Sequence, residues 1–81
     1  MTSQTTETAA LLARITATPG LCGGRACIRN LRIRVVDILE LLAAGLSPAE
    51  VVIELPDLEP DDVRAALVYA ARRLNHPTLF T

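Results

Sequence analysis

Four arginines recur at short intervals in one stretch of the chain, at Arg25, Arg29, Arg32 and Arg34. A guanidinium group donates hydrogen bonds in a planar fork that pairs with carboxylates and with phosphates. This arginine segment, residues 25–34, is therefore a candidate site for binding nucleic-acid phosphates or the carboxylates of a protein partner.

Charge is distributed unevenly along the chain. Five arginines and no acidic residue lie from Arg14 to Arg34, whereas eight acidic residues and no arginine lie from Asp37 to Asp62. Either the arginines are available to a ligand, or they are neutralised inside the fold by packing against the acidic helices. The net charge of −1 argues against non-specific binding of nucleic acid by the whole surface.

A β-hairpin over residues 25–35 would present the arginines together. With a two-residue loop at Asn30-Leu31, the predicted register separates the apolar side chains from the charged ones. Leucine adopts the positive φ of a tight turn poorly, so a longer loop is the alternative. The expected pairs are Arg29 with Arg32, Ile28 with Ile33, Cys27 with Arg34, and Ala26 with Val35. Cys27 then shares the exposed face with the arginines.

Three helices are predicted after the hairpin. Apolar residues at helical spacing predict the first over residues 36–44. A capping box from Ser47 to Glu50 begins the second, and Pro60 begins the third, which covers residues 60–74. Three short helices joined by tight turns are typical of a helix-turn-helix unit. The expected fold class is α+β, mostly α, with a short N-terminal β-hairpin.

We expect a flexible N-terminal arm over residues 1–14, one folded domain over residues 15–76 and a C-terminal tail over residues 77–81. Residues 15–17 can form a short strand. The third helix carries apolar and small residues that permit close packing, either on the core or on a second copy of the chain in a homodimer. These residues are Leu67, Ala70, Ala71 and Leu74.

Composition excludes several classes of function. A chain of 81 residues with Tyr69 and Phe80 as its only aromatic residues offers no platform for stacking bases. The spacing of Cys22, Cys27 and His76 fits no zinc motif, and no combination of residues suggests catalysis. We therefore expect no metal, no other cofactor and no enzyme activity. Without a leader or a membrane-spanning run, a cytoplasmic protein with reduced thiols is expected.

A series of short motifs follows from Ile15 to about Leu74. The motifs are Ile15-Thr16, Pro19-Gly20, Gly23-Gly24-Arg25, Ile28-Arg29 with Arg32-Ile33, Ala44-Gly45-Leu46-Ser47, Leu55-Pro56-Asp57-Leu58, Asp62-Val63 and Ala66-Leu67-Val68-Tyr69-Ala70-Ala71. Their order and spacing resemble a bacterial family known as domain of unknown function 433. Where that family usually has Gly-Thr at the hairpin tip, this chain has Asn30-Leu31.

The resemblance implies a homeodomain-like or winged-helix-like arrangement of the three helices. It also implies an antitoxin of a type II toxin–antitoxin pair, partnered with a PIN-like ribonuclease toxin. Such an antitoxin is expected to regulate its own operon by binding operator DNA as a dimer. Acidic residues at the starts of the second and third helices would repel phosphates, so we expect the arginine segment to contact the DNA. A stand-alone transcriptional regulator and an oligomerisation module with internally neutralised arginines stay open as alternatives.

Overall fold

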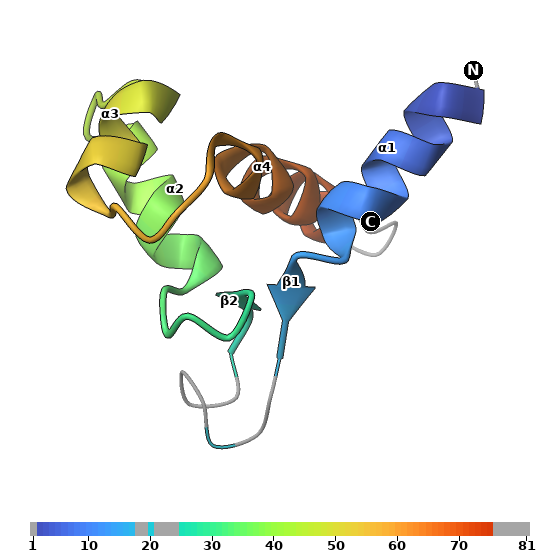
Figure 1. Ribbon diagram of the computed structural model, residues 1–81, viewed down its shortest axis with the longest axis horizontal. Coiled ribbons are helices and arrows are strands. Elements are labelled where there is room, and N and C mark those ends of the chain that lie inside the picture. The colour runs from blue at the N-terminus through green and yellow to red at the C-terminus, as the bar shows by residue number, and fades with distance from the viewer. Residues whose placement is uncertain (1, 18–19, 21–24, 76–81) are drawn as a thin grey trace.

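Four helices and one two-stranded sheet make up the part of the chain that the computed structural model describes, residues 2–17, 20 and 25–75 (Figure 1). The elements are α1 (Thr2–Leu12), β1 (Ile15–Thr16), β2 (Cys27–Ile28), α2 (Val35–Ala43), α3 (Pro48–Glu54) and α4 (Pro60–Leu74). The expected fold class, α+β and mostly helical, is confirmed at this level. Helix α4 is central, with α1 on one side and α2 and α3 on the other (Figure 1).

The three helices predicted after the arginine segment form close to their expected positions. Helix α2 begins one residue early, at Val35, because the Arg34 N–H donates to the Asp37 carboxylate at 3.0 Å and closes the first turn. Helix α3 has the predicted capping box: the Ser47 N–H donates to Glu50 Oε1 at 2.7 Å, and the Glu50 N–H donates to Ser47 Oγ at 3.2 Å. These bonds satisfy N–H groups that a helix start leaves without partners.

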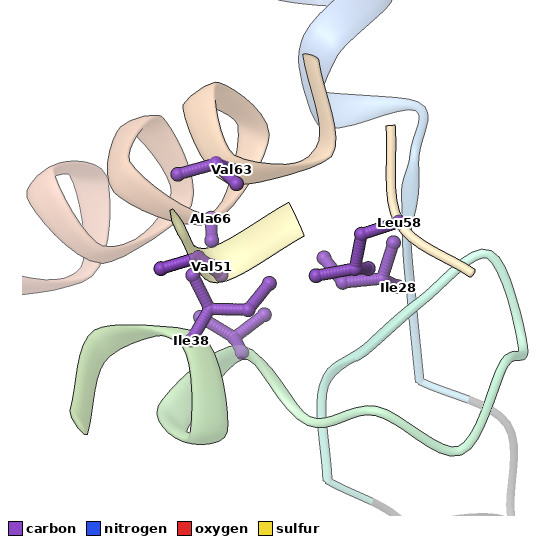
Figure 2. Packing of buried hydrophobic residues seen from close by; sticks show 7 residues of the cluster. Ile28, Ile38, Val51, Leu58, Val63 and Ala66 are labelled. Carbon is purple, nitrogen blue, oxygen red and sulfur yellow. The ribbon is translucent and has the colours of Figure 1, made fainter. Parts of the chain in front are cut away.

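The core lies where β2, α2, α3 and α4 meet (Figure 2). Its buried cluster consists of Ile28, Val35, Ile38, Val51, Leu58, Val63 and Ala66. Burial of each large aliphatic side chain stabilises the fold by about 1.5–3 kcal/mol. Since Ile28 and Val35 are both in this cluster, the core holds the two ends of the stretch that carries Arg29, Arg32 and Arg34.

Strand β2 pairs with β1 rather than with a strand at residues 32–35. The antiparallel pairs are Ile15 with Ile28 and Thr16 with Cys27. A bridge joins Cys27 to Arg34, and the Ile28 N–H donates to the Ile33 carbonyl at 2.9 Å, so the predicted register is confirmed at these pairs. The second strand of the predicted hairpin is reduced to a single bridge at Arg34, because α2 begins at Val35, and the two-stranded sheet is formed by β1 and β2 instead.

The environment of Cys27 also differs from the prediction. The side chain is completely buried, since both residues of β2 are enclosed, and it does not share an exposed face with the arginines. Cys27 is bonded in a disulfide, so the expected reduced thiol is wrong for this residue. Cys22 lies outside the described residues.

Helix α1 occupies most of the segment for which the sequence predicts a flexible arm. Its C-terminal end packs on α4, and Leu11 is buried there. The Thr-rich start of the chain has no amphipathic pattern, so periodicity gives no signal for this helix. The short strand allowed at residues 15–17 is present as β1. The division into arm, domain and tail stays a prediction, and residues 77–81 lie outside the described residues.

Candidate binding surface of the arginine segment

A fully buried carboxylate, Asp62, holds two arginines in place. Arg29 donates to it from Nε at 3.1 Å and from Nη2 at 2.8 Å, and Arg14 donates from Nη1 at 3.0 Å. The Glu59 N–H donates to the same carboxylate at 2.7 Å. Arg29 Nη2 also donates to the carbonyl of Asp57 at 3.1 Å. Arg29 therefore joins the turn after β2 to the start of α4 and belongs to the framework of the fold.

The ionisation of Asp62 is controlled by these partners. Burial raises the pKa of the carboxyl, but hydrogen bonds from Arg29, from the Glu59 N–H and from Arg14 outweigh burial, so the pKa lies below its ordinary value of 3.8. The hydrogen bond with Asp62 raises the pKa of Arg29 in turn. Both groups are consequently charged throughout the neutral pH range.

We expect acid to destabilise the protein through these groups. A carboxyl with a lowered pKa in the folded state stabilises the fold above its unfolded-state pKa, and this contribution is lost as the pH falls through the folded-state value. Asp37 acts in the same direction, because the hydrogen bond from Arg34 lowers its pKa from 3.8. Urea unfolding at about pH 7 and about pH 3 measures the loss. An Asp62→Asn variant should depend less on pH, and an unchanged dependence would contradict this account.

Arg34 is also paired within the fold. Its Nη2 donates to Asp37 Oδ1 at 2.8 Å, and its Nε donates to Asp37 Oδ2 at 3.3 Å. The Arg34 side chain nevertheless stays 38% exposed, so part of it is accessible to solvent. Internal neutralisation, one of the two alternatives for the arginine segment, is thus confirmed for Arg29 and Arg34.

Arg25 and Arg32 differ from these two arginines. Both residues are exposed, and their guanidinium groups make no hydrogen bond or ion pair with the residues that the structure describes. Internal neutralisation therefore does not extend to them. Two guanidinium groups of the segment are left available to an anionic partner.

The tip of the arginine segment has an unusual backbone. Arg29, Asn30 and Arg32 have φ values of 45°, 59° and 67°, in the left-handed region that most residues avoid. The Leu31 N–H donates to the Ile28 carbonyl at 2.7 Å, so Arg29 and Asn30 occupy the centre of a turn with the φ signs of type I′. The two-residue loop at Asn30-Leu31 does not form, and the alternative of a longer loop is confirmed: four residues separate the Ile28–Ile33 pair, and Leu31 packs against the core.

Two hydrogen bonds to residues 14 and 16 help to hold this conformation, which costs about 1–3 kcal/mol for each left-handed residue other than glycine. The Arg29 N–H donates to the Arg14 carbonyl at 2.8 Å, and the Asn30 N–H donates to Thr16 Oγ1 at 3.1 Å. The exposed Arg32 guanidinium is thus carried on a backbone that the surrounding contacts fix.

The predicted packing residues of α4 lie largely outside the core. Leu67 and Leu74 are 44% and 68% exposed, Ala71 is exposed and Ala70 is half-buried. The residues of α4 that enter the core are Val63, Ala65 and Ala66. Packing of the four predicted residues on a second copy of the chain stays a prediction.

A surface groove brings the two predicted sets of residues together. Its volume is about 490 Å³, and its walls include Arg25 and Arg34 from the arginine segment and Ala70 and Leu74 from α4. Arg32 lies elsewhere, in a smaller hollow with Asp37 and Glu40. The structure therefore places half of the predicted site residues around one cavity.

Two further residues shape this groove and are not among the predicted site residues, Tyr69 and Arg73. Arg73 lines the groove and lies over the ring of Tyr69, with 6.0 Å between the guanidinium carbon and the ring centroid. Their spacing of four residues on a helix is a usable signal for such a contact. Away from the groove, the spacing of Asp62 four residues before Ala66 indicates its place on the buried face of α4, although it does not indicate its arginine partners.

Within residues 2–17, 20 and 25–75, no group of three or more His, Cys, Asp or Glu side chains is arranged to hold a metal ion. In the same part of the chain, no helix is long and apolar enough to cross a membrane.

The fold and this surface define a small α+β protein, mostly helical, that carries arginines beside an apolar groove. The family model described as "Protein of unknown function (DUF433)" matches residues 15–70, so the chain belongs to this family, as its motifs predicted. The matched range contains the whole arginine segment and its partner Asp62. No curated protein and no solved structure matches the chain.

Proposed function

We propose that the chain is a non-catalytic antitoxin that binds and neutralises a PIN-like ribonuclease toxin by direct contact. The observation that carries the proposal is the pair of exposed arginines, Arg25 and Arg32, without partners among the described residues. They stand next to two arginines that the fold does neutralise. Because neither guanidinium group contributes an ion pair or a hydrogen bond to the described part of the fold, a role in binding explains these arginines better than a role in folding.

Arginine chemistry suits this target. The resemblance to an antitoxin family implies a toxin that holds its metal ion with clustered carboxylates. A guanidinium group binds carboxylates through two parallel hydrogen bonds and keeps its charge at any physiological pH. Insertion of Arg25 or Arg32 into such a cluster would compete with the metal ion.

Operator DNA is a second candidate ligand, because exposed guanidinium groups also fit phosphates. We propose that α2, α3 and α4 form the homeodomain-like or winged-helix-like unit and that DNA contacts come from the arginine segment of a dimer. The exposed acidic residues Glu50 and Glu54 of α3 and Asp61 in the first turn of α4 make both helices poor surfaces for a phosphate backbone. An affinity for DNA that falls steeply with salt, without a protein partner, would favour a stand-alone regulator.

The oligomerisation module is the third alternative. The internal pairs of Arg29 and Arg34 agree with it, but the exposed Arg25 and Arg32 do not. Self-association of the chain with no other ligand would favour this function.

Purification of the tagged full chain from its own host, with and without nuclease treatment, tests the proposal. We expect a ribonuclease of the metal-dependent type to remain bound after nuclease treatment. Recovery of nucleic acid alone, lost after nuclease treatment, would overturn the antitoxin function in favour of the regulator. Recovery of no partner in either preparation would overturn both.

A further inference from the structure

The groove of about 490 Å³ lies between the start of α2 and the C-terminal half of α4. Its floor is aliphatic, with contributions from Val36, Leu39 and Leu74. Val36 and Leu74 are 41% and 68% exposed, although large apolar side chains are normally covered. A concave apolar surface with a few polar groups at its edge is the usual form of a binding site, so this groove is a candidate for one.

Three arginines surround this apolar floor. Arg25 has no partner for its guanidinium among the described residues, Arg34 is half-exposed beside Asp37, and Arg73 lies over the ring of Tyr69. None of the described residues that line the groove is acidic. The groove therefore combines apolar contact area with a positive rim, and its complement is an apolar side chain flanked by carboxylates.

We propose that the groove binds a segment of the partner protein in which one or two aliphatic side chains are flanked by Asp or Glu. This assignment rests on the proposed function and specifies which part of the partner is recognised. A second copy of the chain is a poorer occupant, because a two-fold contact through this face would set the arginine rims of the two copies against each other.

Two synthetic peptides of identical length test the groove with the full chain. Both carry the same two leucines, and the leucines are flanked by Glu in one peptide and by Gln in the other. We expect the Glu peptide to shift the amide resonances of Val36, Ala70 and Leu74 and to bind about tenfold more tightly at low salt. Equal binding of the two peptides, or shifts confined to another face, would overturn the proposal.

Two variants locate the binding. Ala70→Leu fills the groove and should weaken the Glu peptide by at least about tenfold. Arg73→Gln removes one rim charge and should weaken it by up to about fivefold. Arg64→Gln is the matched control, because Arg64 pairs with Glu7 and Asp61 and does not line the groove. An amide spectrum of each variant verifies folding, and full peptide binding by folded Ala70→Leu would overturn the proposal.

Further outcomes separate this proposal from the antitoxin function. A captured toxin that binds Ala70→Leu normally but not the Arg25→Ala/Arg32→Ala variant would overturn the groove assignment and support the proposed function. Binding of the Glu peptide in the groove, without any captured toxin, would support the groove chemistry and overturn the antitoxin function. If the chain forms dimers that dissociate on Ala70→Leu substitution, the occupant of the groove would be a second copy of the chain, and the proposal of an acidic partner segment would be overturned.

Discussion

Replacement of Asp62 by alanine should lower the free energy of unfolding by about 3–5 kcal/mol, the usual cost of removing one partner from a buried ion pair. The substitution removes the acceptor of Arg29, Arg14 and the Glu59 N–H at once. The Arg29 guanidinium would then lie against the fold without a carboxylate, whereas Arg14 would keep Glu59 at 2.7 Å. Since a chain of this length has a total stability of only about 4–12 kcal/mol, this loss is a large fraction of the stability of the fold.

Asp61→Ala is the control for this prediction. Asp61 belongs to the same helical turn and also lies near Arg14, with 3.9 Å between carboxylate and guanidinium atoms, but its side chain is 52% exposed. Its removal should cost no more than about 1 kcal/mol, as for most surface ion pairs. Urea denaturation followed by circular dichroism measures both variants. If Asp62→Ala lost no more stability than Asp61→Ala, the ion pairs of Asp62 would not be what holds the arginine segment against α4.

The contrast between these two neighbours shows what the sequence can reveal about this fold. Signals within a few residues predict α3 and α4 correctly: the capping box from Ser47 to Glu50 and the proline at position 60 each define a helix start. The role of Asp62 depends on residues 33 and 48 positions away in the chain, Arg29 and Arg14. Such pairs become visible only once the packing of the helices is known.

The arginine segment shows the same limit. Alternation of apolar and charged residues predicts the Cys27–Arg34 and Ile28–Ile33 pairs correctly. It does not predict that β1 pairs with β2, because a strand of two residues carries almost no periodic signal. Nor does it separate the arginines that the fold neutralises from those that it leaves exposed, since all four have the same side chain and similar neighbours.

Binding measurements can distinguish the exposed arginines from those that the fold neutralises. Arg25→Ala/Arg32→Ala should weaken binding of the captured toxin by at least about 100-fold, because close charge pairs at an interface contribute about 1.5 kcal/mol or more each. The free energy of unfolding should change by less than about 0.5 kcal/mol, since neither guanidinium has a partner among the described residues. Alanine retains Cβ, so the left-handed backbone at position 32 bears the same steric cost before and after the substitution. Titration calorimetry and urea unfolding of the same preparation measure both quantities.

Arg25 and Arg32 are chosen so that a loss of binding can be distinguished from a loss of structure, and the control variant distinguishes it from a change in net charge. Substitution of Arg29 or Arg34 would also reduce binding, but it would break ion pairs that hold the fold, so lost binding would follow from lost structure. The control variant Arg64→Ala/Arg72→Ala removes two positive charges from α4, away from the arginine segment. It changes the net charge by the same amount as Arg25→Ala/Arg32→Ala and therefore reproduces any long-range electrostatic effect. If the affinity for the toxin fell equally in both double variants, Arg25 and Arg32 would act only through their long-range positive charge and not through direct contact. A loss confined to Arg25→Ala/Arg32→Ala, with unfolding unchanged, would assign these side chains to the contact itself.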